Sequence, residues 1–123
     1  MSTPFTARYD RASNRIEFCF TGSWDRETMD SWNRTFNSLV AQARRGFTIL
    51  ADLSAYPPQS PEISAGHEKH MKHALAAGMS RAAMVVPGAL SGLQMKRLAG
   101  GAGINPVVSY VDSRHDGLRQ LAA

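Results

Sequence analysis

The sequence predicts an α/β fold in which helices pack on one mixed β-sheet whose later strands are parallel. Near the N-terminus, apolar and polar residues alternate, which is typical of strands with one buried face. In two long segments, apolar residues recur at helical spacing. Short apolar runs separate these segments and are typical of strands covered on both faces. The expected order of elements is β-β-α-β-α-β-α-β-α.

The first three elements are a predicted hairpin and a long helix. In the stretch RIEFCF, Ile16, Phe18 and Phe20 alternate with more polar residues, and the turn formers DRASN precede it. A helix follows over residues 25–45, with Asp25 as its N-cap. Its aromatic and aliphatic residues share one face, which indicates core packing.

The central part of the chain predicts a buried strand, a stiff loop and a second helix. The strand is FTILADLS, which is apolar on both faces. The loop AYPPQSPE contains Pro57 and Pro58, whose backbone dihedrals are restricted. Ser60 reads as an N-cap and Pro61 as the first helical residue. This helix is expected to continue to about Ala77 and to end at Gly78.

The last third predicts strand, helix, strand and helix in turn. SRAAMVVP and INPVVSYV are the strands, and GALSGLQMKRLAGGAG is the helix between them. DSRHDGLRQLAA is the last helix, with Asp112 as its expected cap. All of residues 1–123 are assigned to a single domain.

Composition excludes several classes of protein. The chain is 43% hydrophobic and 20% charged, which is typical of globular domains. No apolar run reaches the ~20 residues that span a bilayer, and the first residues lack a signal-peptide pattern. The single cysteine, Cys19, cannot form an internal disulfide, so we expect a cytoplasmic location. The net charge of +4 comes from scattered arginines, which argues against a nucleic-acid partner.

Three histidines lie in the stretch HEKHMKH of the second helix. On a helical wheel His67 faces the core, whereas His70 and His73 turn progressively toward solvent. The three do not converge on one point, so no metal or other cofactor is predicted. Asp52, Ser54 and either His67 or His115 are residue types found in hydrolases, but no nucleophile elbow accompanies them. We therefore predict no catalytic residue.

Open α/β sheets bind other molecules at the carboxyl ends of their strands. The segments that follow the predicted strands therefore form the expected binding rim. Its residues are Asp52, Ser54, Tyr56, Ser60, Gly88, Ser91 and Asp112.

The stretches RIEFCFTGSWD, FTILADLSAY and PVVSYVDSRHDGLRQL, in this order, resemble the STAS or SpoIIAA-like family. This family includes anti-sigma factor antagonists and relatives likened to Sec14 lipid carriers. The resemblance implies a SpoIIAA-like fold and a non-enzymatic regulatory module. It also implies a serine that a partner kinase phosphorylates, and the matching position is Ser60. The antagonists have Asp-Ser-Ser-Gly at this turn, where this chain has Pro-Gln-Ser-Pro-Glu.

Two classes of function stay open. The first is a protein-interaction module, whose partner would be a kinase or an anti-sigma type regulator and in which Ser60 is a switch or only a helix cap. The second is a binder or carrier of a small apolar or anionic ligand, because the many alanines, methionines and glycines leave room between sheet and helices. A homodimer is also compatible with the sequence, if RIEFCF forms an exposed edge strand.

Overall fold

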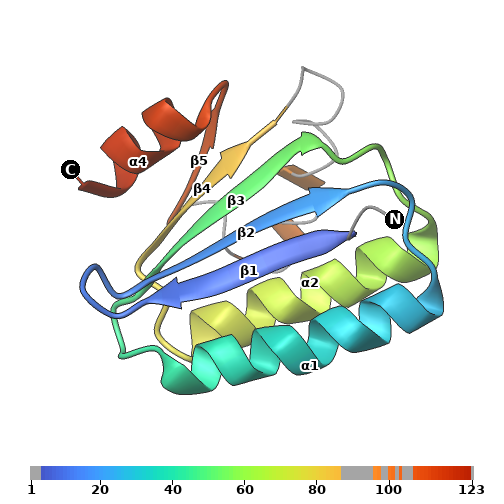
Figure 1. Cartoon of the computed structure of the whole chain (residues 1–123), viewed down its shortest axis with the longest axis horizontal. Coiled ribbons are helices and arrows are strands. Elements are labelled where there is room, and N and C mark those ends of the chain that lie inside the picture. The colour runs from blue at the N-terminus through green and yellow to red at the C-terminus, as the bar shows by residue number, and fades with distance from the viewer. Residues whose placement is uncertain (1–3, 87–95, 98–99, 102, 104–106, 123) are drawn as a thin grey trace.

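A computed structural model describes residues 4–86, 96–97, 100–101, 103 and 107–122 (Figure 1). Most of the helix predicted over residues 88–103 lies outside this range, as do Gly88 and Ser91. The described elements are β1 (Phe5–Asp10), β2 (Arg15–Thr21), α1 (Arg26–Gln42), β3 (Thr48–Ala55), α2 (Pro61–Ala76), β4 (Arg81–Val85), β5 (Val108–Val111) and α4 (Arg114–Ala122).

The strands form one mixed sheet in the order β1-β2-β3-β4-β5. β1 and β2 are the predicted antiparallel hairpin, and β3, β4 and β5 each add in parallel to the preceding strand. The predicted fold class is therefore confirmed. The expectation that RIEFCF is an edge strand is wrong, because Phe5–Asp10 pairs along its outer side. A homodimer that forms through an exposed edge of this strand is therefore no longer supported.

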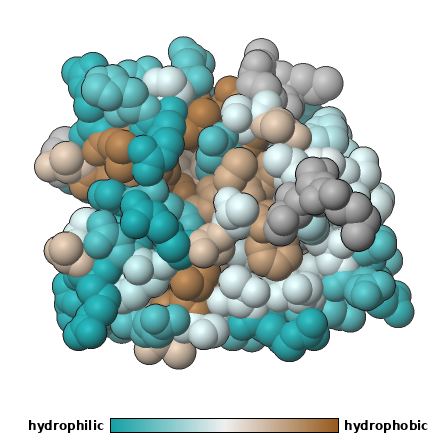
Figure 2. Space-filling model, in the orientation of Figure 1, coloured by the Kyte–Doolittle hydropathy of each residue, from teal (hydrophilic) through white to brown (hydrophobic). Residues whose placement is uncertain are grey.

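The helices cover the two faces of the sheet unequally (Figure 1). α1 and α2 lie side by side on one face and enclose the main core, which contains Phe20, Trp32 and Ile49. α4 lies on the opposite face over a smaller cluster that includes Leu50 and Ala83. In the view of Figure 2, hydrophilic residues surround a central apolar region. β3 is thus covered on both faces, as its unbroken apolar run predicts.

Side-chain caps define where the helices begin. Asp25 accepts a hydrogen bond from the Thr28 amide at 2.8 Å, and Ser60 accepts one from the Ile63 amide at 3.3 Å. Both predicted caps are confirmed. The prediction that Asp112 caps the last helix is wrong, because α4 begins one residue later than expected. Ser113 takes its place, and the Ser113 hydroxyl accepts from the Asp116 amide at 3.1 Å.

α4 packs very closely on the sheet through Gly117. A Cβ atom at this position would lie 2.7 Å from Cδ1 of Leu50, a distance that real Cβ contacts essentially never show. A side chain here would force Leu50 or α4 to shift, so glycine favours this close approach of α4 to β3. α4 contacts β3, β4 and β5, and polar side chains of β1 and β2 line a hollow on the same face of the sheet.

Candidate functional site

The main core contains a cavity of about 60 Å³ between the sheet and the helices α1 and α2. Its lining is almost entirely apolar and comes from β2, β3, β4 and both helices. The apolar lining residues are Phe18, Phe20, Trp32, Phe36, Ile49, Ala51, Leu53, Met71, Ala74, Met79, Ala82 and Met84. Three polar groups interrupt this surface, and they belong to Tyr56, His67 and His70.

His67 and Tyr56 form a buried polar pair at the cavity. His67 is 6% exposed and Tyr56 is 5% exposed, and Nε2 of His67 lies 2.7 Å from the tyrosine hydroxyl. The imidazole stacks on Phe20 with ring centroids 5.3 Å apart. Burial lowers the pKa of His67 to about 3, with a smaller contribution from His70. Burial also raises the pKa of Tyr56, so both partners are uncharged near neutral pH.

His70 is the second buried histidine. Its side chain is 8% exposed, and its Nε2 lies 2.8 Å from Oδ1 of Asn33 on α1. Burial lowers the pKa of His70 to about 4, and the neighbouring His73 contributes to the same shift. Nδ1 of His70 is buried and has no hydrogen-bond partner in the described part of the chain. The prediction that His70 faces solvent is wrong, because α1 packs alongside α2 and buries this flank of the helix.

The three histidines of HEKHMKH do not share one site. The rings of His67 and His70 have centroids 6.4 Å apart, and each uses its Nε2 in a separate hydrogen bond. His73 is exposed. In residues 4–86 and the other described positions, no group of three or more His, Cys, Asp or Glu side chains could hold a metal ion. His67 and His70 instead belong to the core.

The expected binding rim divides into separate places. Asp52 and Ser54 remain near the end of β3, where the Ser54 amide and hydroxyl both donate to Oδ1 of Asp52. Tyr56 turns inward to His67 and is not a surface residue. Ser60 is exposed at the start of α2, and Asp112 is exposed beyond β5. Gly88 and Ser91 lie outside the described residues.

Gln59 is a residue whose role the sequence did not reveal. Its side-chain oxygen accepts from the Trp24 amide at 2.8 Å. Its side-chain nitrogen donates to the carbonyls of Gly22 and Pro57, at 3.0 Å and 2.7 Å. Gln59 thereby ties the loop before α1 to the loop before α2, next to the aromatic core. No local pattern marks this role, since two of the three partners, Trp24 and Gly22, lie 35 and 37 residues away in the sequence.

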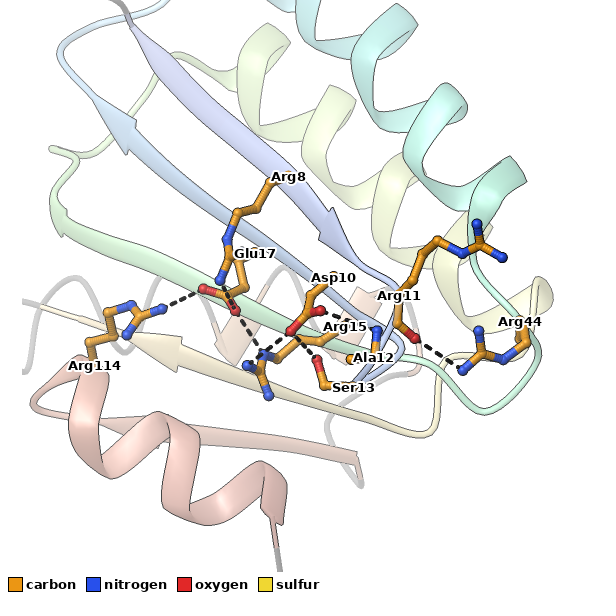
Figure 3. A network of polar contacts seen from close by, with 9 residues as sticks. All are labelled: Arg8, Asp10, Arg11, Ala12, Ser13, Arg15, Glu17, Arg44 and Arg114. Atoms are coloured by element: carbon orange, nitrogen blue, oxygen red, sulfur yellow. Dashed lines mark hydrogen bonds and ion pairs between the residues drawn. The ribbon is translucent and has the colours of Figure 1, made fainter.

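A separate polar cluster lies on the opposite face of the sheet (Figure 3). Glu17 of β2 is 8% exposed and receives hydrogen bonds from Arg8 at 3.1 Å, Arg15 at 2.9 Å and Arg114 at 2.5 Å. Burial raises the pKa of Glu17, but hydrogen bonds from Arg15 and Arg114 and the charges of Arg15 and Arg8 outweigh it. The pKa is therefore lowered. Arg114 starts α4, so this ion pair joins residues 97 positions apart in the sequence.

A hollow of about 220 Å³ adjoins this cluster and is lined by Arg8, Glu17, Cys19, Asp52 and Arg114, among others. Burial and the charge of Asp52 raise the pKa of the Cys19 thiol, so the reactive thiolate is disfavoured. Asp52 and His67, two of the residue types found in hydrolases, are not brought together. Asp52 lines this hollow, whereas His67 lines the cavity on the other face of the sheet.

No protein-family model matches the chain, and no curated protein matches it. Solved structures do match. An uncharacterised protein of the DUF3478 family from Shewanella loihica PV-4, with a SpoIIAA-like fold, matches with a TM-score of 0.73 over 98% of both chains at 16% identity. The chain has a SpoIIAA-like fold. The protein TM1081 matches with a TM-score of 0.64 at 12% identity, covering 99% of this chain and 91% of TM1081.

This SpoIIAA-like fold positions two chemically different sites. The face covered by α1 and α2 holds an apolar cavity with uncharged hydrogen-bonding groups. The opposite face carries the ion pairs of Glu17. No helix in the described ranges is both long and apolar enough to span a bilayer.

Proposed function

We propose that the protein binds a small, mostly apolar molecule in the cavity between the sheet and the helices α1 and α2. The main support is the combination of this apolar cavity with the unpartnered Nδ1 of His70. Protein interiors are close-packed, and buried polar atoms rarely lack a hydrogen-bond partner. A bound molecule would account for both departures at once.

The cavity is larger than a water site, and its lining can adapt to a small ligand. Its volume of about 60 Å³ exceeds the roughly 10–15 Å³ that one water needs. It is smaller than an engineered cavity of about 150 Å³ that takes benzene. Met71, Met79 and Met84 line it, and methionine side chains adapt readily to irregular space. Rearrangement of these side chains would admit a single aromatic ring.

Replacement of Ala74 by valine tests this proposal. Ala74 is a buried residue of the cavity wall, and two added carbons would take up space that a ligand needs. We expect wild type to bind toluene and Ala74→Val to bind it about tenfold more weakly, since overpacking costs roughly 1–3 kcal/mol. Titration calorimetry with toluene measures this, and methyl NMR shifts locate the bound ring.

Ala76→Val is the matched control, because Ala76 lies on the same helix and is exposed. Its toluene affinity should equal that of wild type. Equal affinities in all three proteins, or toluene shifts away from the cavity, would contradict the proposal. Native mass spectrometry of the protein from its natural source would then report whether an organic molecule co-purifies.

The exposed Ser60 favours a second candidate function, which is a phosphorylation-controlled protein-interaction module. Ser60 stands at the N-terminus of α2 in a SpoIIAA-like fold. A phosphate at this end of a helix is stabilised by the helix dipole, so it would add charge without melting α2. It would add negative charge next to the Arg26–Glu62 ion pair, which has an N–O distance of 2.8 Å.

Mass spectrometry of the chain purified from its natural source tests this second candidate. We expect the added mass of one phosphate, which should disappear in Ser60→Ala and persist in Ser54→Ala. Ser54 is also exposed but caps no helix. Ser60→Glu should weaken capture of the partner protein. A phosphate elsewhere, or none under any growth condition, would remove Ser60 from this role.

A further inference from the structure

We infer that the ligand of the cavity carries a neutral hydrogen-bond donor, such as a hydroxyl group, which pairs with Nδ1 of His70. This inference rests on the proposed ligand-binding function and adds the chemical class of the ligand. His70 is one of the residues that line the cavity, and its Nδ1 is buried without a partner in the described chain. Nε2 of His67, by contrast, already pairs with Tyr56.

Asn33 determines which nitrogen of His70 carries the proton. Oδ1 of Asn33 lies 2.8 Å from Nε2 of His70, and an amide oxygen can only accept a hydrogen bond. With Oδ1 of Asn33 facing the ring, Nε2 is the donor of this hydrogen bond. In a neutral imidazole the other nitrogen is then an acceptor, so Nδ1 presents a lone pair. A ligand group that pairs with it must supply a hydrogen atom.

The surroundings of His70 keep it neutral. From α1 it meets Asn33 and the rings of Trp32 and Phe36, with centroid distances of 6.4 Å and 5.0 Å for the rings. From its own helix it meets His67, and the charge of His73 acts on it. None of these groups is a carboxylate, so none stabilises an imidazolium. Burial accordingly lowers the pKa of His70 to about 4.

The lone pair on Nδ1 and the neutral state of His70 together determine which apolar ligands fit. An alcohol, phenol or amide N–H satisfies Nδ1 and leaves its hydrocarbon part against the apolar lining. A pure hydrocarbon fills the space but leaves Nδ1 unpaired, which costs binding free energy. A carboxylate or a ketone brings a second acceptor to the lone pair and is repelled. The class is therefore a small, neutral, mostly apolar hydrogen-bond donor.

Phenol and toluene test the inference, because they share a ring and are similar in size but only phenol can donate. Calorimetry gives the ratio of phenol to toluene affinity in wild type and in His70→Phe. We expect this ratio to fall about tenfold in the variant, which is the loss of one hydrogen bond of about 1.4 kcal/mol. Toluene itself should still bind His70→Phe. His73→Phe, an exposed change on the same helix, should keep the wild-type ratio.

A long-range ¹H–¹⁵N spectrum of the wild-type protein gives a readout that needs no variant. It should show an unprotonated Nδ1 in His70, whose resonance moves on addition of phenol and not of toluene. An equal affinity ratio in wild type and His70→Phe, or a protonated Nδ1, would overturn the inference while toluene binding leaves the proposed function standing. If neither probe binds wild type, both are overturned.

Discussion

Lowering the pH from about 7 to about 5 is expected to destabilise the folded protein by several kcal/mol, through His67 and His70. Both imidazoles are buried, and their pKa values in the folded chain are about 3 and about 4. An unfolded histidine has a pKa near 6.5. Between these pKa values, the two histidines therefore bind protons in the unfolded chain but not in the folded chain. The stabilisation is complete above about pH 6.5 and is lost as the pH falls toward the folded values.

The expected size follows from the number of protons involved. Each histidine contributes about 1.4 kcal/mol per pH unit within this window. Between about pH 6.5 and 5, two histidines together remove roughly 4 kcal/mol. This is a large part of the 5–15 kcal/mol that stabilises a typical domain. The carboxyl groups with lowered pKa values, such as Glu17, lose their stabilising effect only as the pH falls below their ordinary values near 4.

Urea unfolding at three pH values between about 7 and 5 measures this loss. His70→Phe should show about half of the wild-type dependence on pH, since only His67 then remains buried and titratable. His115→Gln is the control, because His115 is exposed on α4 and lies outside the core. A wild-type free energy of unfolding that stays constant over this range would show that the two buried histidines are not neutral in the folded state.

Local patterns in the sequence predicted the elements of the fold, and long-range packing decided the site. Two kinds of feature depend only on neighbouring residues and can be predicted from a single sequence. They are the alternation of Ile16, Phe18 and Phe20, and the helix caps at Asp25 and Ser60. The burial of His70 depends on how α1 lies against α2, which a helical wheel of α2 alone does not contain.

The same limit applies to the residues that complete the two sites. Asn33 fixes the tautomer of His70 from a different helix, 37 positions away. Tyr56 looked like a rim residue because it follows β3, yet its ring enters the core and its hydroxyl meets His67. Arg114 reaches Glu17 from the start of α4, a helix that packs on the sheet through Gly117. Each of these contacts is a product of tertiary structure, and none has a signature at short sequence range.

Trp32→Ala is expected to lower the free energy of unfolding by about 3–5 kcal/mol. Trp32 of α1 is 1% exposed and joins the helix to the hairpin. Its ring lies edge-on to Phe5, Phe18 and Phe20, with centroid distances of 5.1 Å, 4.9 Å and 4.8 Å. Removing it deletes these contacts together with a large buried apolar area. Arg34→Ala, an exposed change on the same helix, should shift stability by less than about 0.5 kcal/mol.

Trp32→Ala also tests whether ligand binding in the cavity raises the stability of the folded protein. Trp32 lines the cavity, so its truncation enlarges the space next to His70 instead of filling it. A ligand that binds only the folded state raises stability by mass action. Phenol should therefore recover part of the stability lost in Trp32→Ala, and toluene should recover less because it cannot pair with Nδ1 of His70. Urea unfolding with and without each probe measures both effects. A loss below about 1 kcal/mol would show that the aromatic cluster is not the centre of the core, and equal recovery by the two probes would show that the enlarged cavity binds by shape alone.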